Sequence, residues 1–152
     1  MTLVHASAVL LGQKAVLLTG ETGSGKSTIA LQLIKGHGAT LIGDDRIYLA
    51  KHGAAVMARP HDNLLGLTEM RGLGLLRLPY CPQAEVALAI ELTSKAHVAR
   101  LATNAVYQYD GLSIPLLRLD GHDPNTPLKI SLALTALADG FREDAIYPLE
   151  DQ

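Results

Sequence analysis

The sequence predicts an α/β fold, a mixed sheet with substantial antiparallel pairing and few helices. Three observations support this prediction. An apolar run at residues 14–19 leads straight into a glycine-rich loop, after which apolar residues follow helical spacing. Several β-type runs meet at turn-forming residues, as the strands of hairpins do. Beyond the helix that follows this loop, only residues 125–140 have the pattern of an amphipathic helix.

The first half of the chain places one helix among paired strands. Residues 3–11 and 14–19 form the first expected hairpin, which turns at the Gly-Gln dipeptide between them. A helix is expected from Lys26 to the KGHG segment at 35–38, because apolar residues recur every three or four positions and glycines end the pattern. The remaining strands of this half are residues 39–43, 46–50 and 54–60.

The second half is expected to be mostly β-structure. Residues 61–71 are predicted to form an exposed loop. Residues 72–78 and 84–92 are predicted to be strands. Residues 105–119 are predicted to form a hairpin that turns at an Asp-Gly dipeptide, which favours tight hairpin turns.

A final helix is predicted at residues 125–140. Asn125 or Thr126 supplies the cap, Pro127 suits the first turn, and Gly140 ends the helix. The apolar residues expected to face the core are Leu128, Leu132, Leu134 and Leu137.

Composition limits the kinds of partner. With 152 residues the chain has the length of one domain, and 48% hydrophobic residues with a net charge of −2 indicate a globular protein rather than a membrane-spanning one. No stripe of Lys or Arg is present, so no nucleic acid partner is expected. Cys81 is the single cysteine, and the N-terminus has no basic segment ahead of its apolar run. Both observations favour the cytoplasm.

Residues 20–27, GETGSGKS, have the spacing of a phosphate-binding loop. Glycines let successive backbone N–H groups converge on phosphate oxygens, and the helix N-terminus adds partial positive charge. Lys26 is expected to reach the β- and γ-phosphates and Ser27 to bind Mg²⁺, so the minimum ligand is a magnesium nucleoside triphosphate. The expected nucleotide-binding residues are Gly20, Glu21, Thr22, Gly23, Ser24, Gly25, Lys26, Ser27 and Thr28.

Asp44 and Asp45 follow the predicted strand at 39–43. If this strand lies parallel beside residues 14–19, both strands end at one sheet edge and the carboxylates face the loop. One acid could then coordinate or orient while the other accepts the proton of an attacking hydroxyl. An acid pair at a strand end can equally form a turn or a helix cap, so both interpretations stay open.

Three further polar residues allow both a structural and a functional interpretation. His5 lies in an apolar strand expected beside the loop strand, so it is either a core histidine or a neighbour of the acid pair. Glu69 either completes a Mg²⁺ shell or pairs with Arg71 at the surface. In the functional interpretation, Arg71 holds a phosphate.

Together these motifs resemble the C-terminal catalytic domain of HPr kinase/phosphorylase, a bacterial family that phosphorylates a serine of the phosphocarrier protein HPr. The stretches VHAS, GETGSGKST, LIGDDR and EMRGLGLLRL occur in the family's order, and the resemblance covers nearly the whole chain. It implies a P-loop-containing mixed sheet like that of HPr kinase and phosphoenolpyruvate carboxykinase, as a single domain over residues 1–152. It also implies ATP as substrate, Mg²⁺ as cofactor, HPr or an HPr-like protein as partner, and a homo-oligomer, in the family a hexamer.

The resemblance also implies roles for individual residues. Asp45 would accept the proton of the substrate serine, with Asp44 and His5 supporting it. In the reverse reaction inorganic phosphate attacks phosphoserine, and Asp45 would act as the acid. The residues assigned catalytic roles are Asp45, Asp44, His5, Lys26, Arg71 and Arg100, and the metal ligands are Ser27 and Glu69.

The sequence departs from the family at some points. The 152 residues do not include the family's N-terminal domain, Thr28 stands where a glutamate is frequent, and residues 114–127 do not reproduce the Gly-Arg-Asn of the loop linked to dephosphorylation. These departures bear on the phosphorylase direction more than on the kinase direction. Two alternative functions stay open: an ATP-sensing regulatory module that transfers no phosphate, and a kinase for a small molecule.

Overall fold

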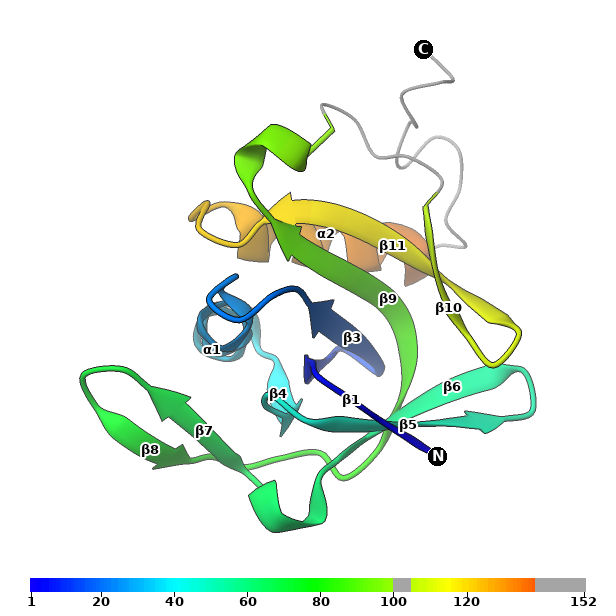
Figure 1. Cartoon of the computed structure of the whole chain (residues 1–152), viewed down its shortest axis with the longest axis horizontal. Helices are drawn as coiled ribbons and strands as arrows, with labels where there is room; N and C mark the ends of the chain where they lie inside the picture. Colours follow the sequence, from blue (N-terminus) through cyan, green and yellow to red (C-terminus); the bar gives the residue numbers. More distant parts are fainter. Residues whose placement is uncertain (100–104, 139–152) are drawn as a thin grey trace.

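The computed structural model describes residues 1–99 and 105–138 of the chain. More of these residues belong to strands than to helices, and two helices complete the described fold (Figure 1). The strands are β1 (Thr2–Val4), β2 (Ser7–Leu11), β3 (Lys14–Thr19), β4 (Thr40–Gly43), β5 (Ile47–His52), β6 (Ala55–Pro60), β7 (Leu67–Met70), β8 (Gly74–Arg77), β9 (Ala84–Thr93), β10 (Val106–Tyr109) and β11 (Leu112–Asp120). The helices are α1 (Lys26–His37) and α2 (Thr126–Ala138), and the short 3-10 turns are η1 (Asp62–Leu64) and η2 (Lys95–His97).

The main sheet is mixed and branches at β9. Its strands follow the order β1-β5-β6-β9-β3-β2-β4, and β11 joins β9 as a further partner. The β9 strand pairs in parallel with β3 and β11 but antiparallel with β6. This arrangement confirms the predicted α/β class with much antiparallel pairing. The hairpin of β7 and β8 forms a separate two-stranded sheet.

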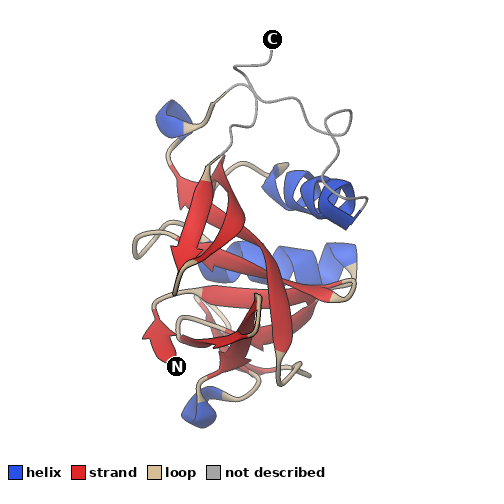
Figure 2. Cartoon of the chain, turned by 90° about the vertical axis from the view of Figure 1, so that its right-hand side faces the viewer, coloured by secondary structure: helices blue, strands red, loops and turns tan. Residues whose placement is uncertain are grey.

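Both faces of the sheet are buried, each in its own core. Both helices pack on one face, where Ile29 and Leu33 of α1 and Ile130 of α2 meet apolar residues of β2, β3, β9 and β11 (Figure 2). The other face is covered by the β5–β6 hairpin and by β10 and β11. Because successive residues of a strand point to opposite faces, Val16 and Leu17 of β3 belong to different cores.

An irregularity in β9 changes which face its side chains occupy. The register with β3 shifts between Ala15 and Val16, so that Val16 pairs with Leu88 although Ala15 pairs with Val86. An extra residue in one strand reverses the alternation beyond it. Val86 and Leu88 therefore lie in opposite cores despite being two residues apart.

The predicted strand 3–11 is two strands rather than one. The chain breaks at His5 and Ala6, and β1 pairs with β5 while β2 pairs with β3 and β4. The prediction that strand 39–43 lies beside 14–19 is also wrong, because β2 lies between β3 and β4. Since β2 is antiparallel to both, β3 and β4 still run in the same direction and end at the same sheet edge.

Two predictions for the chain beyond residue 60 need correction. Residues 67–70, expected in an exposed loop, form β7, which pairs with β8. In α2, Leu128 and Leu132 are exposed, whereas Ile130, Ala133 and Leu134 face the core. The prediction is therefore wrong for Leu128 and Leu132 and confirmed for Leu134. The side chain of Leu137 lies outside the described residues.

Candidate phosphoryl-transfer site

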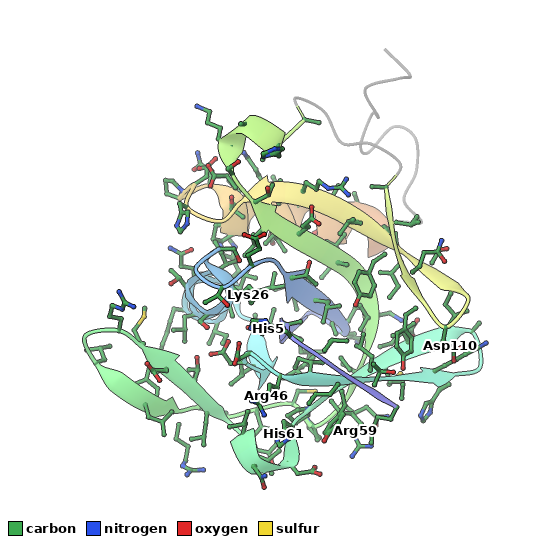
Figure 3. All side chains as sticks on the ribbon, in the orientation of Figure 1. His5, Lys26, Arg46, Arg59, His61 and Asp110 are labelled. Carbon is green, nitrogen blue, oxygen red and sulfur yellow. The ribbon has the colours of Figure 1, made fainter. Side chains whose placement is uncertain are left out.

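The glycine-rich loop joins β3 to α1 as the motif predicts. The backbone of Gly25 has a φ of 104°, a left-handed conformation that glycine adopts without a Cβ penalty. Lys26 is buried at the start of α1, and its ammonium donates to the carbonyls of Gly20 (2.8 Å) and Glu21 (3.1 Å), which holds it over the loop (Figure 3). The loop therefore presents a cation and a helix N-terminus to one space, which is a suitable cradle for phosphate.

The turn from β11 to α2 packs against this loop. A Cβ added to Gly121 would lie 1.6 Å from the carbonyl oxygen of Ser24, and one added to Gly25 would lie 2.5 Å from the carbonyl oxygen of Gly121. Both positions therefore require glycine. The turn is itself ordered by the amide of Asn125, which donates to the Asp123 carboxylate at 2.8 Å and lowers the pKa of that carboxyl.

Asp44 is the centre of a hydrogen-bond network at the end of β4. The residue is 7% exposed, and three hydroxyl groups donate to its carboxylate. Ser7 and Thr68 each lie 2.6 Å away, and Ser27 lies 2.8 and 3.0 Å from the two carboxylate oxygens. Such short contacts are typical of hydroxyls that donate to an ionised carboxylate. Asp44 is thereby fixed beside the loop.

Asp45 is exposed to solvent, whereas Asp44 is buried. Its φ of 68° is left-handed, a conformation that aspartate tolerates better than most residues but that still stores about 1–3 kcal/mol of strain. Its side chain is 61% exposed and lies 2.5 Å from Nε2 of His5. The acid pair thus forms a turn, as one of the two interpretations predicted. The turn leaves the carboxylate of Asp44 buried and that of Asp45 exposed.

His5 is not a core residue. Its side chain is 52% exposed, and it is placed by the break between β1 and β2. A cavity of about 410 Å³ lies beside the His5–Asp45 pair, lined also by Leu3, Val4 and Arg46. His5 and Arg46 come from the β1–β2 and β4–β5 links at this edge (Figure 3).

The donor atoms around Asp44 fit a Mg²⁺ ion that shares its shell with phosphate. Carboxylate and hydroxyl oxygens from Asp44 and Ser27 are the hard ligands that Mg²⁺ prefers. No cluster of three or more His, Cys, Asp or Glu side chains that could hold a metal occurs within residues 1–99 and 105–138. Mg²⁺ is usually bound by one or two protein carboxylates plus water and substrate phosphates, so two protein ligands suffice.

The other predicted residues are not brought into this network. Glu69 follows Thr68 in β7 and is exposed, because alternate residues of a strand point to opposite sides. Arg71 and Thr28 are also exposed. Arg100 lies outside the described residues.

Ser7 and Thr68 are the site residues that the sequence analysis missed. Ser7 lies inside the stretch VHAS, and Thr68 lies directly before the stretch EMRGLGLLRL, which begins at Glu69. A hydroxyl in a strand has no spacing signal of its own. Only the fold, which brings β2 and β7 to the end of β4, shows that both donate to Asp44.

Among the residues that the structure describes, neither helix is long and apolar enough to cross a membrane.

The family model for the HPr Serine kinase C-terminal domain matches residues 1–81. The chain is also similar to a solved HPr(Ser) kinase/phosphatase from Coxiella burnetii, with a TM-score of 0.82, 22% identity, and coverage of 93% of this chain and 99% of that one. At this identity the likeness shows the fold.

Curated relatives carry the name HPr kinase/phosphorylase. The protein of Mycoplasma mycoides is 41% identical over 47% of this chain and 22% of its own length. That of Lactobacillus delbrueckii is 39% identical over 64% of this chain and 34% of its own length. That of Streptococcus thermophilus is 29% identical over 93% of this chain and 48% of its own length. The chain thus spans less than half the length of these relatives.

Proposed function

Because the chain belongs to the HPr serine kinase C-terminal domain family, we propose that it transfers the γ-phosphate of ATP to a serine of HPr or an HPr-like phosphocarrier protein. The observation that supports this proposal most strongly is that two adjacent acids have different surroundings. Asp44 is buried against Ser27 of the phosphate-binding loop, and Asp45 is exposed beside His5. In this proposal, Asp44 acts at the phosphates and Asp45 acts where an acceptor can approach.

The transfer follows from these positions. Backbone N–H groups of the loop and the Lys26 ammonium bind the phosphates and offset their charge. Asp45 takes the proton of the acceptor serine as its oxygen bonds to the γ-phosphorus. The bond between that phosphorus and the β,γ-bridging oxygen breaks, and ADP leaves. His5 orients the Asp45 carboxylate through their hydrogen bond.

Asp44 and Ser27 would hold Mg²⁺ on the side of the loop that faces β4. When bound, Mg²⁺ neutralises charge that develops on the phosphate oxygens. Asp44 is suited to this role because Ser7 and Thr68 fix its carboxylate from the far side. We retain Glu69 as a further proposed ligand, Arg71 as a proposed phosphate-binding residue, and Arg100 as a proposed catalytic residue.

The exposure of the acceptor side supports a protein substrate over a small molecule. More than half of each side chain in the His5–Asp45 pair is exposed. A folded protein can present a serine on a loop to such an open surface, whereas small-molecule sites commonly bury most of their ligand. Phosphate transfer rather than ATP sensing alone is supported by an exposed acid paired with a histidine, which a sensor does not require.

Transfer of labelled γ-phosphate from Mg-ATP to purified HPr tests the proposal. We expect Asp45→Asn to reduce the rate at least about a hundredfold, since general base catalysis contributes about 10²–10⁴. Asp62→Asn, which changes an exposed acid in η1, serves as the matched control. HPr with alanine at the acceptor serine should stay unlabelled. Bound ATP without any labelled HPr would refute HPr as substrate, and full activity of Asp45→Asn would refute the role of that acid.

Four further properties stay predictions: three are implied by the resemblance, and the cytoplasmic location is expected from the single cysteine and the N-terminal sequence. A homo-oligomer, expected as a hexamer, is tested by light scattering on the purified chain. A cytoplasmic location is tested by cell fractionation. Folding of residues 1–152 as a single domain is tested by one cooperative transition in urea. The reverse reaction, in which inorganic phosphate removes the phosphoryl group, is tested by release of pyrophosphate from phosphorylated HPr.

A further inference from the structure

A second cavity touches the phosphate-binding loop, on the flank away from the acid pair. Its volume is about 530 Å³, and its walls are loop residues 20–24, residues 91–94 at the end of β9, His97 and His122. The loop strand β3 lies between β2, which contributes to the acid site, and β9, which contributes to this cavity. The cavity and the acid site therefore lie on opposite flanks of one loop.

The direction of a bound triphosphate follows from this arrangement. In the proposed mechanism, the transferable phosphate lies on the β4 flank of the loop, where Ser27 contacts Asp44. The opposite end of the triphosphate must then leave toward β9 and β11. Strand β9 is parallel to β3, and β11 is parallel to β9. The carboxyl ends of β9 and β11 therefore lie at the same sheet edge as the loop. Ligands of α/β sheets bind at this edge.

The size and lining of the cavity fit a nucleoside. Small-molecule sites commonly have volumes of about 300–1,000 Å³. The histidine rings of His97 and His122 can stack on a base, as aromatic side chains do in nucleic-acid recognition. The hydroxyls of Thr93 and Ser94 and the carboxylate of Glu91 can bind ribose hydroxyls.

The wall that the cavity shares with the loop contains a polar atom without a partner. The hydroxyl oxygen of Ser24 is buried and makes no hydrogen bond to any of the described residues. A buried hydroxyl without a partner is costly, because its hydration is lost without replacement. A ligand oxygen that enters between the loop and the cavity would supply the missing partner.

The backbone of His122 and the ring of His97 are held in position before any ligand binds. The amide of His122 donates to the Asp120 carboxylate at 2.9 Å, and Gly121 packs directly on the loop. His97 is fixed by a 2.9 Å hydrogen bond between its Nδ1 and the Ser94 hydroxyl. The ordered ring of His97 and the ordered backbone at His122 lose less entropy when a ligand binds than mobile groups would.

These observations point to a nucleoside site, and we infer that this cavity binds the base and ribose of the nucleoside triphosphate, with His122 stacked against the base. The inference rests on the proposed use of a nucleoside triphosphate. It adds a site for the half of the ligand that the loop does not recognise, and it assigns that half to residues from β9, η2 and the β11–α2 turn.

Calorimetric binding of two probes to the full chain tests this site. Mg-ATP contains the nucleoside, whereas magnesium tripolyphosphate has only the phosphates. We expect His122→Ala to weaken Mg-ATP binding roughly tenfold, the scale of one lost base-stacking contact, and to leave tripolyphosphate binding unchanged. Lys26→Ala should weaken both probes. His52→Ala, which removes an exposed histidine at the end of β5, is the matched control and should change neither.

Several results would overturn the inference. An equal loss of both probes in His122→Ala would mean that the residue supports the loop rather than the nucleoside. Unchanged Mg-ATP binding, or wild-type chain that binds tripolyphosphate as tightly as Mg-ATP, would remove the nucleoside site altogether. If thermal melting shows that His122→Ala does not fold, His122→Gln gives the same comparison. Because no HPr is present, failure to phosphorylate HPr leaves this result unaffected.

Discussion

Replacing Ser7 with alanine tests whether the buried Asp44 carboxylate depends on its hydroxyl donors. Ser7 is fully buried, and its hydroxyl donates to Asp44 at 2.6 Å while it accepts from the Asp45 amide at 3.2 Å. A hydrogen bond to a charged group contributes about 1.5–3 kcal/mol, and one between neutral groups about 1 kcal/mol. We therefore expect Ser7→Ala to lower the free energy of unfolding by about 2.5–4 kcal/mol.

Urea unfolding at neutral pH measures this loss, and a double-mutant cycle assigns it. Ser7→Ala, Asp44→Asn and the double variant should give a coupling energy of about 1.5–3 kcal/mol, because only the bond between the two side chains is shared. Ser113→Ala removes an exposed hydroxyl from β11 and should stay within about 0.5 kcal/mol of wild type. A loss below about 1 kcal/mol in Ser7→Ala, or a coupling energy near zero, would refute the network as a source of stability.

Three further changes have expected outcomes. Gly121→Ala should lower the melting temperature, because the added Cβ would lie 1.6 Å from a loop carbonyl oxygen. Gly36→Ala is the control, because this position on α1 faces open space, and it should raise stability by up to about 1 kcal/mol. Equal effects of the two substitutions would contradict the packing argument. Burial, aided by the charge of Tyr109, raises the pKa of Tyr107 above 10.0, so stability should be full below this pH and fall as pH rises through the raised pKa. Urea titrations at about pH 8 and about pH 11 measure the free energy of unfolding. The decrease between these two pH values should be smaller in Tyr107→Phe than in wild type, and an equal decrease would contradict the role of Tyr107. Glu69→Gln should weaken Mg²⁺ binding by the ATP-bound chain in calorimetry if Glu69 is a ligand, and unchanged affinity would remove it from the metal site.

Features that depend on neighbouring residues could be predicted from the sequence. The strand–loop–helix unit, the hairpin at Asp110 and Gly111, and the ends of α1 each depend on a few adjacent residues whose backbone preferences are strong. The break after Val4 could not be predicted, because it arises from the pairing of β1 with β5, more than forty residues later. Local patterns contain no information on such partners.

The same limit applies to the site. Lys26, Ser27, Asp44 and Asp45 stand in motifs, and the structure places them together at one sheet edge. The donors to Asp44 from β2 and β7, and the cavity walls from β9 and the β11–α2 turn, come from segments that are distant in sequence. Their residues have no mutual spacing to detect, so only the folded topology shows them.

The three partners of β9 have a consequence for how the protein opens. Both cores contain side chains of this strand, Leu88 and Ile90 in one and Val86 and Ala89 in the other. Neither half of the sheet can separate without breaking a ladder of β9. In native-state hydrogen exchange, amides in the middle of β9 should therefore exchange only through global unfolding, while those of the β7–β8 hairpin should exchange through local opening. The two layers form one cooperative unit because they share a strand.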